Sequence, residues 1–152
     1  MKDSVDVAII GAGQAGLATS WHLKQAGVDH CVLEAGRVAE TWRTRRWDSF
    51  RLVTPNRFVL LPGAEYKGRD PDGLIDLAQL IDHLQSWADS FEAPVEENTQ
   101  VMSLEAEGSG FRLALRSGAV KARRVVVASA AAVRAAIGPH WSPKWSGIHR
   151  VE

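Results

Sequence analysis

The sequence predicts an α/β fold with a parallel sheet and a dinucleotide site, and two observations predict it. An apolar run at residues 5–10 leads into Gly11-Ala12-Gly13-Gln14-Ala15-Gly16, which opens a helix. A second apolar run ends at Glu34, 23 positions after Gly11. Strand, glycine turn, helix, strand and acid in this register form the fingerprint of a dinucleotide site. The complete register argues against the alternative, a glycine-rich turn of purely structural meaning.

The first predicted unit consists of strand 5–10, helix 14–26 and strand 29–34. Its three glycines have different tasks: Gly11 allows the tight turn, Gly13 lets the backbone approach phosphates, and Gly16 lets the helix pack against the strand. The helix begins with free N–H groups and the positive end of its dipole, which favour a pyrophosphate. Residues 11–16 are therefore expected to hold the phosphates, Ala12, Gln14 and Ala15 included.

The acid that ends the second strand is expected to bind the ribose of the dinucleotide. Glu34 is placed to accept hydrogen bonds from ribose hydroxyls, and its neighbour Ala35 is counted in the same site. A carboxylate repels a 2′-phosphate, so we expect this site to refuse NADP although Arg37 is near.

Residues 37–73 have no sustained apolar period and contain several prolines and glycines, so we predict a long irregular segment. A loop of this length is usually functional, and here it would cover a cofactor. Its alternation of cations and rings also suits a single-stranded nucleic-acid platform: Arg43, Arg45, Arg46 and Arg51 with Trp42, Trp47 and Phe50. Because this is one loop of a neutral chain, we expect no nucleic-acid partner. Some of these arginines have a plainer alternative in surface ion pairs with Glu40, Asp48 or Glu65.

A second helix is predicted over residues 77–91. Asp76 and Gln79 have the spacing of a capping box, and apolar residues follow at helical intervals. The polar face carries Asp82 and His83. Adjacent helical positions point in different directions and no further ligands follow, so we predict a solvated face and no metal site.

From Thr99 onward the apolar period changes to two, which predicts three short antiparallel strands. The alternating residues are Met102, Leu104, Phe111, Leu113, Leu115, Val120 and Ala122. The run at 125–128 has no alternation, which predicts a strand buried on both faces that returns to the parallel sheet. The single cysteine, Cys31, lies inside a predicted strand and is expected to be a buried thiol without a disulfide.

The segment from Glu40 to Asn56 resembles the part that follows the fingerprint in flavin-dependent monooxygenase-like oxidoreductases, which have two dinucleotide-binding domains. The resemblance runs from about residue 4 to residue 128. Members typically carry Gly-Gly-Thr-Trp, where this chain has Ala39-Glu40-Thr41-Trp42. The resemblance implies a Rossmann-like FAD-binding domain, in which a three-stranded antiparallel meander forms the crossover. It also implies FAD as cofactor and NADPH as co-substrate.

Individual roles follow from this resemblance. Trp42 and Arg43 would lie along the flavin or its phosphates. Thr54 and Asn56 would approach the isoalloxazine ring, and Val101 would contact the adenine through its main chain. Each of these roles is carried over from the family, one position at a time.

The chain departs from the family after Ala128, which is itself counted in the cofactor site. Relatives continue with Ala-Thr-Gly, whereas this chain has Ala128-Ser129-Ala130, and a side chain there is costly if the backbone needs φ > 0 or touches the cofactor. We predict residues 4–128 as a partial dinucleotide-binding domain and residues 129–152 as an irregular tail, with a short helix as the alternative for the alanine run. A second glycine fingerprint is not recognisable, so the chain is expected to represent the FAD-binding portion, truncated before the NADPH domain.

Two function hypotheses therefore stand: an FAD-dependent oxidoreductase represented by its FAD-binding portion, and a non-catalytic module or remnant that binds a dinucleotide or a partner chain without turnover. No nucleophile, acid–base set or metal set stands out, and the histidines are expected to be structural. Lys plus Arg equals Asp plus Glu at 18 each, so no global field attracts nucleic acid or an anionic membrane. With no recognisable leader or membrane span, we predict a cytoplasmic protein.

Overall fold

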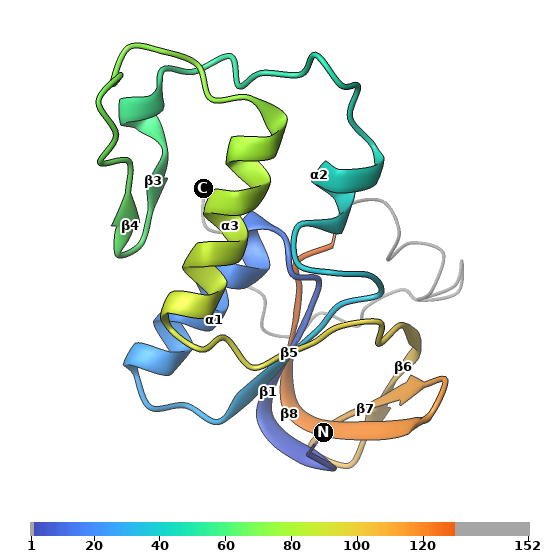
Figure 1. Cartoon of the computed structure of the whole chain (residues 1–152). Coiled ribbons are helices and arrows are strands. Elements are labelled where there is room, and N and C mark those ends of the chain that lie inside the picture. Colours follow the sequence, from blue (N-terminus) through green and yellow to red (C-terminus); the bar gives the residue numbers. More distant parts are fainter. Residues whose placement is uncertain (1, 130–152) are drawn as a thin grey trace.

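The computed structural model describes residues 2–129, which form an α/β fold around one mixed sheet. The six-stranded sheet has the order β5-β2-β1-β8-β7-β6 (Figure 1). Neighbours from β5 to β8 run parallel, and β8, β7 and β6 form an antiparallel meander. The strands are β1 (Ser4–Ile10), β2 (His30–Leu33), β5 (Val95–Glu96), β6 (Val101–Glu107), β7 (Gly110–Leu115) and β8 (Gly118–Val127). The predicted fold class is confirmed.

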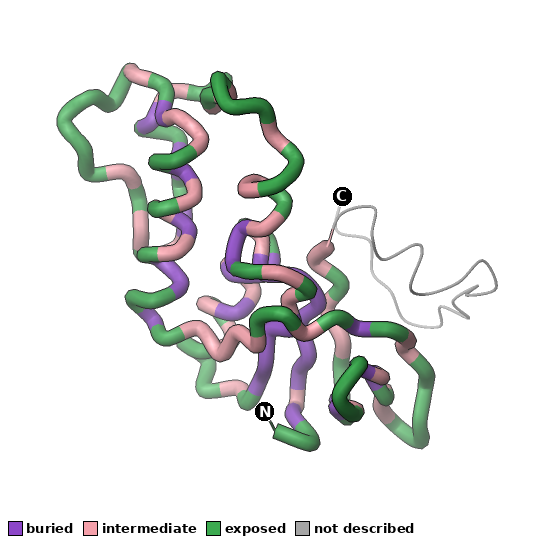
Figure 2. Tube along the Cα trace, turned by 45° about the vertical axis from the view of Figure 1, so that its right-hand side comes forward, coloured by how far each residue is buried: buried purple, intermediate pink, exposed green. Residues whose placement is uncertain are grey.

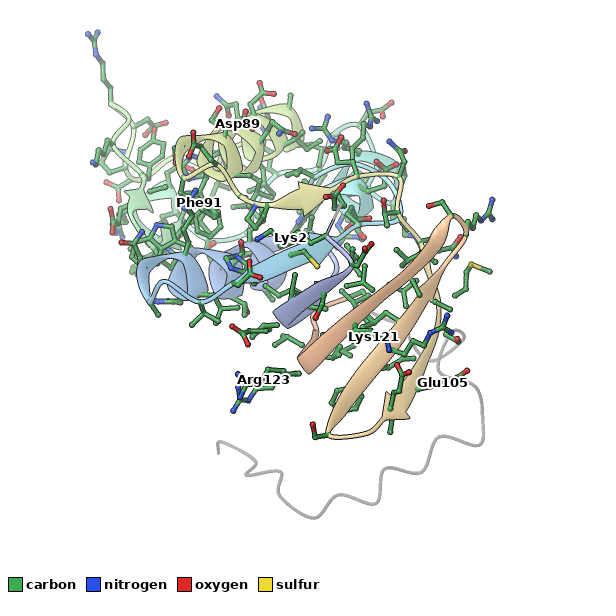
Figure 3. All side chains as sticks on the ribbon, turned by 90° about the horizontal axis from the view of Figure 1, so that it is seen from below. Lys2, Asp89, Phe91, Glu105, Lys121 and Arg123 are labelled. Carbon is green, nitrogen blue, oxygen red and sulfur yellow. The ribbon has the colours of Figure 1, made fainter. Side chains whose placement is uncertain are left out.

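Helices cover one face of the central strands and the meander covers the other. Figure 3 shows α3 with Asp89 on one side and the meander with Glu105 and Lys121 on the other. The helical elements are α1 (Gln14–Gln25), α2 (Glu40–Thr44), the 3₁₀ turn η1 (Asn56–Phe58) and α3 (Leu77–Ser90). A small hairpin of β3 (Leu60–Leu61) and β4 (Ala64–Glu65) lies beyond them.

Two apolar clusters fill the two layers. Because successive side chains of a strand point to opposite faces, Ile9 packs in the cluster that includes Leu17 and Leu84 of the helices, and Ile10 packs in the cluster that includes Leu113 of the meander. Figure 2 shows the buried residues concentrated where the central strands meet these layers. Coverage on both faces explains the unbroken apolar run of β1.

The long strand β8 corrects the predicted end of the meander. A short strand near 120–122 and a separate strand at 125–128 were expected, but Gly118–Val127 is one strand. It pairs antiparallel with β7 up to Ala122 and parallel with β1 up to Val127. The expected burial of 125–128 on both faces is wrong: Val127 is 43% exposed, and the other three residues are only half-buried. Among residues 2–129, β8 beyond Ala122 pairs with β1 alone.

Helix α3 is built as its sequence predicts. Asp76 Oδ1 accepts the Gln79 N–H at 2.9 Å, and Gln79 Oε1 accepts the Asp76 N–H at 3.0 Å, which completes the capping box. Asp82 is exposed as expected. The solvated environment expected for His83 is wrong, because His83 is half-buried and its Nε2 donates to the Ala64 carbonyl at 3.1 Å. The β3–β4 hairpin thus rests on α3.

The excursion between β2 and α3 contains short elements that its sequence does not predict. Asn56 is buried and fixes this segment: its Oδ1 accepts the Ile75 N–H at 2.7 Å and its Nδ2 donates to the Asp70 carbonyl at 2.9 Å. The two-residue strands β3, β4 and β5 are too short to show a period. Nor does α2 begin with a recognisable side-chain cap.

Cys31 is buried in β2 as predicted, and burial, reinforced by the carboxylates of Glu96 and Asp29, raises the pKa of its thiol to about 11. Within residues 2–129, no helix is long and apolar enough to cross a membrane. The predicted tail at 129–152, with the alternative helix and the alanine at 130, falls beyond the described residues except for Ser129.

Candidate functional site

A cavity of about 520 Å³ opens at the carboxyl ends of β1, β2 and β8, within the size range of small-molecule sites. Parallel sheets bind ligands at this edge. Five segments meet there: the glycine turn, the loop after β2, helix α2 with the arginines that follow it, the start of β6 with the residues before it, and the two residues after β8. The main lining residues are Gly11, Gly13, Glu34, Ala35, Gly36, Glu40, Thr41, Trp42, Arg45, Arg46, Thr99, Gln100, Val101, Ser103, Ala128 and Ser129.

The three glycines of the turn have the three environments expected of them. Gly11 has φ +107°, and a Cβ on it would lie 3.1 Å from the Ser129 backbone nitrogen. A Cβ on Gly16 would collide with the Gly11 carbonyl oxygen, so this glycine permits close packing of helix on strand. A Cβ on Gly13 would meet no protein atom within 4 Å. Gly13 therefore faces open space in the cavity, where a ligand can approach the backbone.

Helix α1 begins at this open glycine. Gly13 is its N-cap residue, no side chain caps it, and its first turn carries no acidic residue. The first N–H groups of a helix have no partner within the helix, and here no side chain supplies one. These donors and the positive end of the helix dipole make the turn suitable for an anion.

Glu34 braces the turn. Its Oε2 accepts the Ala12 N–H at 2.7 Å and its Oε1 accepts the Gly36 N–H at 3.0 Å. A carboxylate has about four lone-pair positions, so two acceptor positions remain after these bonds. Glu34 can thus hold the backbone and accept hydroxyl groups at the same time.

The loop that follows Glu34 is fixed against its neighbours. The Ala39 N–H donates to the Ala12 carbonyl at 3.0 Å, and the Val38 N–H donates to Glu97 Oε1 at 2.8 Å. Ala39 has φ 63°, a left-handed conformation that favours glycine, and it is the position where the resembling family has one. This backbone turn starts α2 directly beside the phosphate turn.

The structure brings together half of the residues that the sequence assigned to the cofactor. Seven line the cavity: Gly11, Gly13, Glu34, Ala35, Trp42, Val101 and Ala128. Ala12, Gln14, Ala15 and Gly16 belong to the same turn and helix start without lining it.

Three other assigned residues lie away from this cavity. Arg43 turns towards α3, where its Nε donates to the Val38 carbonyl at 2.9 Å and its Nη2 to Gln85 Oε1 at 3.3 Å. Thr54 is exposed, and both ends of the Asn56 amide are engaged in the fold. Their roles towards a cofactor stay predictions.

Sequence analysis missed Arg45 and Arg46 as cavity residues. The Arg46 guanidinium lies over the Trp42 ring at 4.7 Å from its centroid. Residues three and four apart share a side of a helix. Arg45 and Arg46 lie three and four positions after Trp42 but just beyond the end of α2 at Thr44, so helical spacing hints at their position beside Trp42 without fixing it.

The chemistry of the cavity fits a dinucleotide. Ser129 Oγ is a buried side-chain oxygen without a hydrogen-bond partner among the residues that the structure describes, and Ser129 lines the cavity. Buried polar atoms normally have partners, so this oxygen is suited to a polar ligand. Among residues 2–129, no three metal-ligating side chains come together. A glycine turn, an uncapped helix start and a braced acid at one sheet edge are the arrangement typical of dinucleotide-binding α/β domains.

The chain belongs to the pyridine nucleotide-disulphide oxidoreductase family, whose model matches residues 8–131. An "uncharacterized oxidoreductase CzcO-like" of Geobacillus kaustophilus is 40% identical over 130 residues, covering 85% of this chain and 37% of the relative. The indole-3-pyruvate monooxygenase YUCCA6 of Arabidopsis thaliana is 33% identical over 96 residues, covering 62% of this chain and 23% of the relative.

A solved flavin-containing monooxygenase from Stenotrophomonas maltophilia has a similar structure, with TM-score 0.74 and 28% identity, over 84% of this chain and 38% of that one. These findings confirm the predicted relationship to flavin-dependent monooxygenases. The chain spans less than two fifths of the length of these relatives, which agrees with the expected FAD-binding portion.

Proposed function

We propose that this chain binds FAD and is the FAD-binding portion of a flavoprotein oxidoreductase of the NAD(P)H-dependent, monooxygenase-like type. The observation that carries the proposal is the cavity in which the open Gly13, the uncapped start of α1 and the braced Glu34 meet. The name of the flavin-containing monooxygenase from Stenotrophomonas maltophilia supports flavin as the ligand. Residues 4–128 would form this FAD-binding unit. The expected cellular compartment of the protein is the cytoplasm.

Different residues of the cavity would bind different parts of the dinucleotide. The start of α1 holds the diphosphate, and the two remaining acceptor positions of Glu34 hold the ribose hydroxyls. Ala35 and the backbone at Val101 flank the adenine, and Trp42 forms a wall of the cavity. When bound, FAD would supply the acceptor for a hydride from NADPH. The residues named here would bind and orient the FAD.

The proposal is tested by titrating the purified chain with FAD and comparing two variants of the same helix. Gly13→Val adds a branched side chain at a φ of −84°, which any residue adopts, and directs it into the cavity. We expect the variant to stay folded and to lose FAD binding. Ala26→Val adds a similar group at the exposed far end of α1 and should bind like the unmodified chain.

Each contrary result has a separate meaning. Unchanged FAD affinity in Gly13→Val would show that the glycine turn is not the binding site. Binding of ADP together with no binding of FAD by the unmodified chain would replace the proposal with the non-catalytic nucleotide-binding module.

A further inference from the structure

We infer that Arg45 and Arg46 are the cations that neutralise the phosphates of the bound dinucleotide. The resemblance to relatives pointed to Arg43 for this task. The inference rests on the proposed function and deepens it, because it assigns two residues and a ligand group within the same cavity.

Arg45 and Arg46 differ from the other arginines of the excursion in what their guanidinium groups contact. Arg37 pairs with Glu40 and Arg57 with Asp72, Arg43 binds the Val38 carbonyl and Gln85, and Arg51 binds the Leu74 carbonyl. Arg69 does not line the cavity. No carboxylate among residues 2–129 lies within ion-pair distance of Arg45 or Arg46. Both line the cavity. Two guanidinium groups that have no counter-ion within the described part of the chain therefore line the wall of the proposed site.

The acidic side chains of the cavity already have hydrogen-bond or ion-pair partners. Glu40 Oε2 accepts the Arg37 backbone N–H at 3.1 Å and lies 3.5 Å from Arg37 Nε. Both oxygens of Glu34 accept backbone N–H groups. Glu34 keeps its negative charge, whereas Glu40 is paired with Arg37. The two guanidinium groups of Arg45 and Arg46 exceed the single remaining acidic charge, and a cleft with such an excess attracts an anionic ligand.

The guanidinium group of Arg46 is held in place by two aromatic rings and one backbone carbonyl. Its guanidinium stacks over Trp42 at 4.7 Å and over Phe50 at 5.7 Å from the ring centroids, and its Nη1 donates to the Arg45 carbonyl at 3.1 Å. A guanidinium has five N–H donors, so most remain for a ligand. Because the group is already positioned, binding an anion immobilises little more of the side chain.

Phosphate is the anion that the rest of the cavity indicates. The glycine turn and the start of α1 line the same space, and Ala39 ties the beginning of α2 to that turn. Planar guanidinium forks match phosphate oxygens in pairs, which a single lysine charge does not. The phosphates concerned are the two that link the halves of the dinucleotide, with a 2′-phosphate on the ribose as the competing source of the same chemistry.

The test compares Arg45→Gln/Arg46→Gln with Arg45→Lys/Arg46→Lys by calorimetry with FAD, ADP, 2′,5′-ADP and adenosine. We expect the glutamine pair to weaken FAD and ADP about tenfold or more, as expected for lost charge-assisted hydrogen bonds, and to leave adenosine within about twofold. The lysine pair should recover part of the loss. Arg51→Gln is the matched control, since Arg51 belongs to the same excursion and does not line the cavity.

Three results would overturn the inference. Unchanged ADP affinity in the glutamine pair would show that the arginines do not bind phosphate. An equal loss of adenosine affinity would show that they contact the base or stabilise the fold instead. Preference of the unmodified chain for 2′,5′-ADP over ADP, lost in the glutamine pair, would move them to a 2′-phosphate. If these results occur while Gly13→Val still abolishes FAD binding, the proposed function stands and this inference alone fails.

Discussion

The carboxylate of Glu34 has two roles: it accepts backbone hydrogen bonds that stabilise the fold, and it is proposed to bind the ribose of the ligand. Its two oxygens hold the N–H groups of Ala12 and Gly36. Glu34→Gln leaves only one oxygen to accept, so one of these donors loses its partner. We expect the free energy of unfolding to fall by about 1–3 kcal/mol and adenosine binding to weaken. Urea unfolding and calorimetry measure the two effects.

The control for this change is Glu105→Gln, since Glu105 is exposed on β6 and should be neutral. The charge of Glu34 also sets a preference between nucleotides. FAD should bind the unmodified chain in preference to NADP, whose 2′-phosphate the carboxylate repels. Preference for NADP would contradict the role given to Glu34.

Cys31 makes stability depend on pH. Burial and nearby carboxylates raise the pKa of its thiol from 9.0 to about 11, so the folded chain holds this proton more tightly than the unfolded chain. The stabilisation is complete below pH 9 and is lost as the pH rises towards 11. We expect stability to decline more steeply over this interval in the unmodified chain than in Cys31→Ala. Parallel slopes in urea unfolding at pH 8, 9, 10 and 11 would contradict this expectation.

The capping box of α3 is a local contribution that can be measured separately. Asp76→Ala removes the acceptor of the Gln79 N–H and should cost about 0.5–2 kcal/mol. Asp76→Ser, which keeps a capping oxygen, should restore most of the loss. Asp82→Ala, on the exposed side of the same helix, should change little. Equal effects of Asp76→Ala and Asp82→Ala on thermal unfolding would exclude the cap as the cause.

Elements with a long period or a defined cap could be predicted from the sequence. This applies to β1, α1, β2 and α3, and to the start of the meander. The two-residue strands β3, β4 and β5 and the five-residue helix α2 could not be predicted, because they depend on contacts with distant segments. The same reason explains the missed arginines: Arg45 and Arg46 reach the cavity only because Ala39 turns α2 onto the phosphate turn. For Asn56, the resemblance implies a position near the isoalloxazine, which stays a prediction, whereas the hydrogen bonds of its amide to Ile75 and Asp70 could be found only in the structure.

The two apolar clusters share the central sheet, and we expect them to unfold together. Leu84→Ala on the helix side and Leu113→Ala on the meander side each empty a fully buried position and should cost about 2–5 kcal/mol. In both variants, the combined tryptophan fluorescence and far-UV circular dichroism should report one coincident transition. Leu60→Ala is the control, since Leu60 is 66% exposed. Separate transitions in Leu113→Ala would show that the meander is an independent unit.

The pairing of β1 with β8 determines when the nucleotide turn can be completed during folding. Ser4 pairs with Lys121, and the Ala128 N–H bonds to the Ile10 carbonyl at 2.9 Å. Closing a chain segment of this length is entropically costly and slows folding. On the ribosome, Gly11 emerges long before the backbone of Ala128 and Ser129 that packs against it. The turn whose residues come first in the sequence is therefore among the last parts of the molecule to reach its final shape.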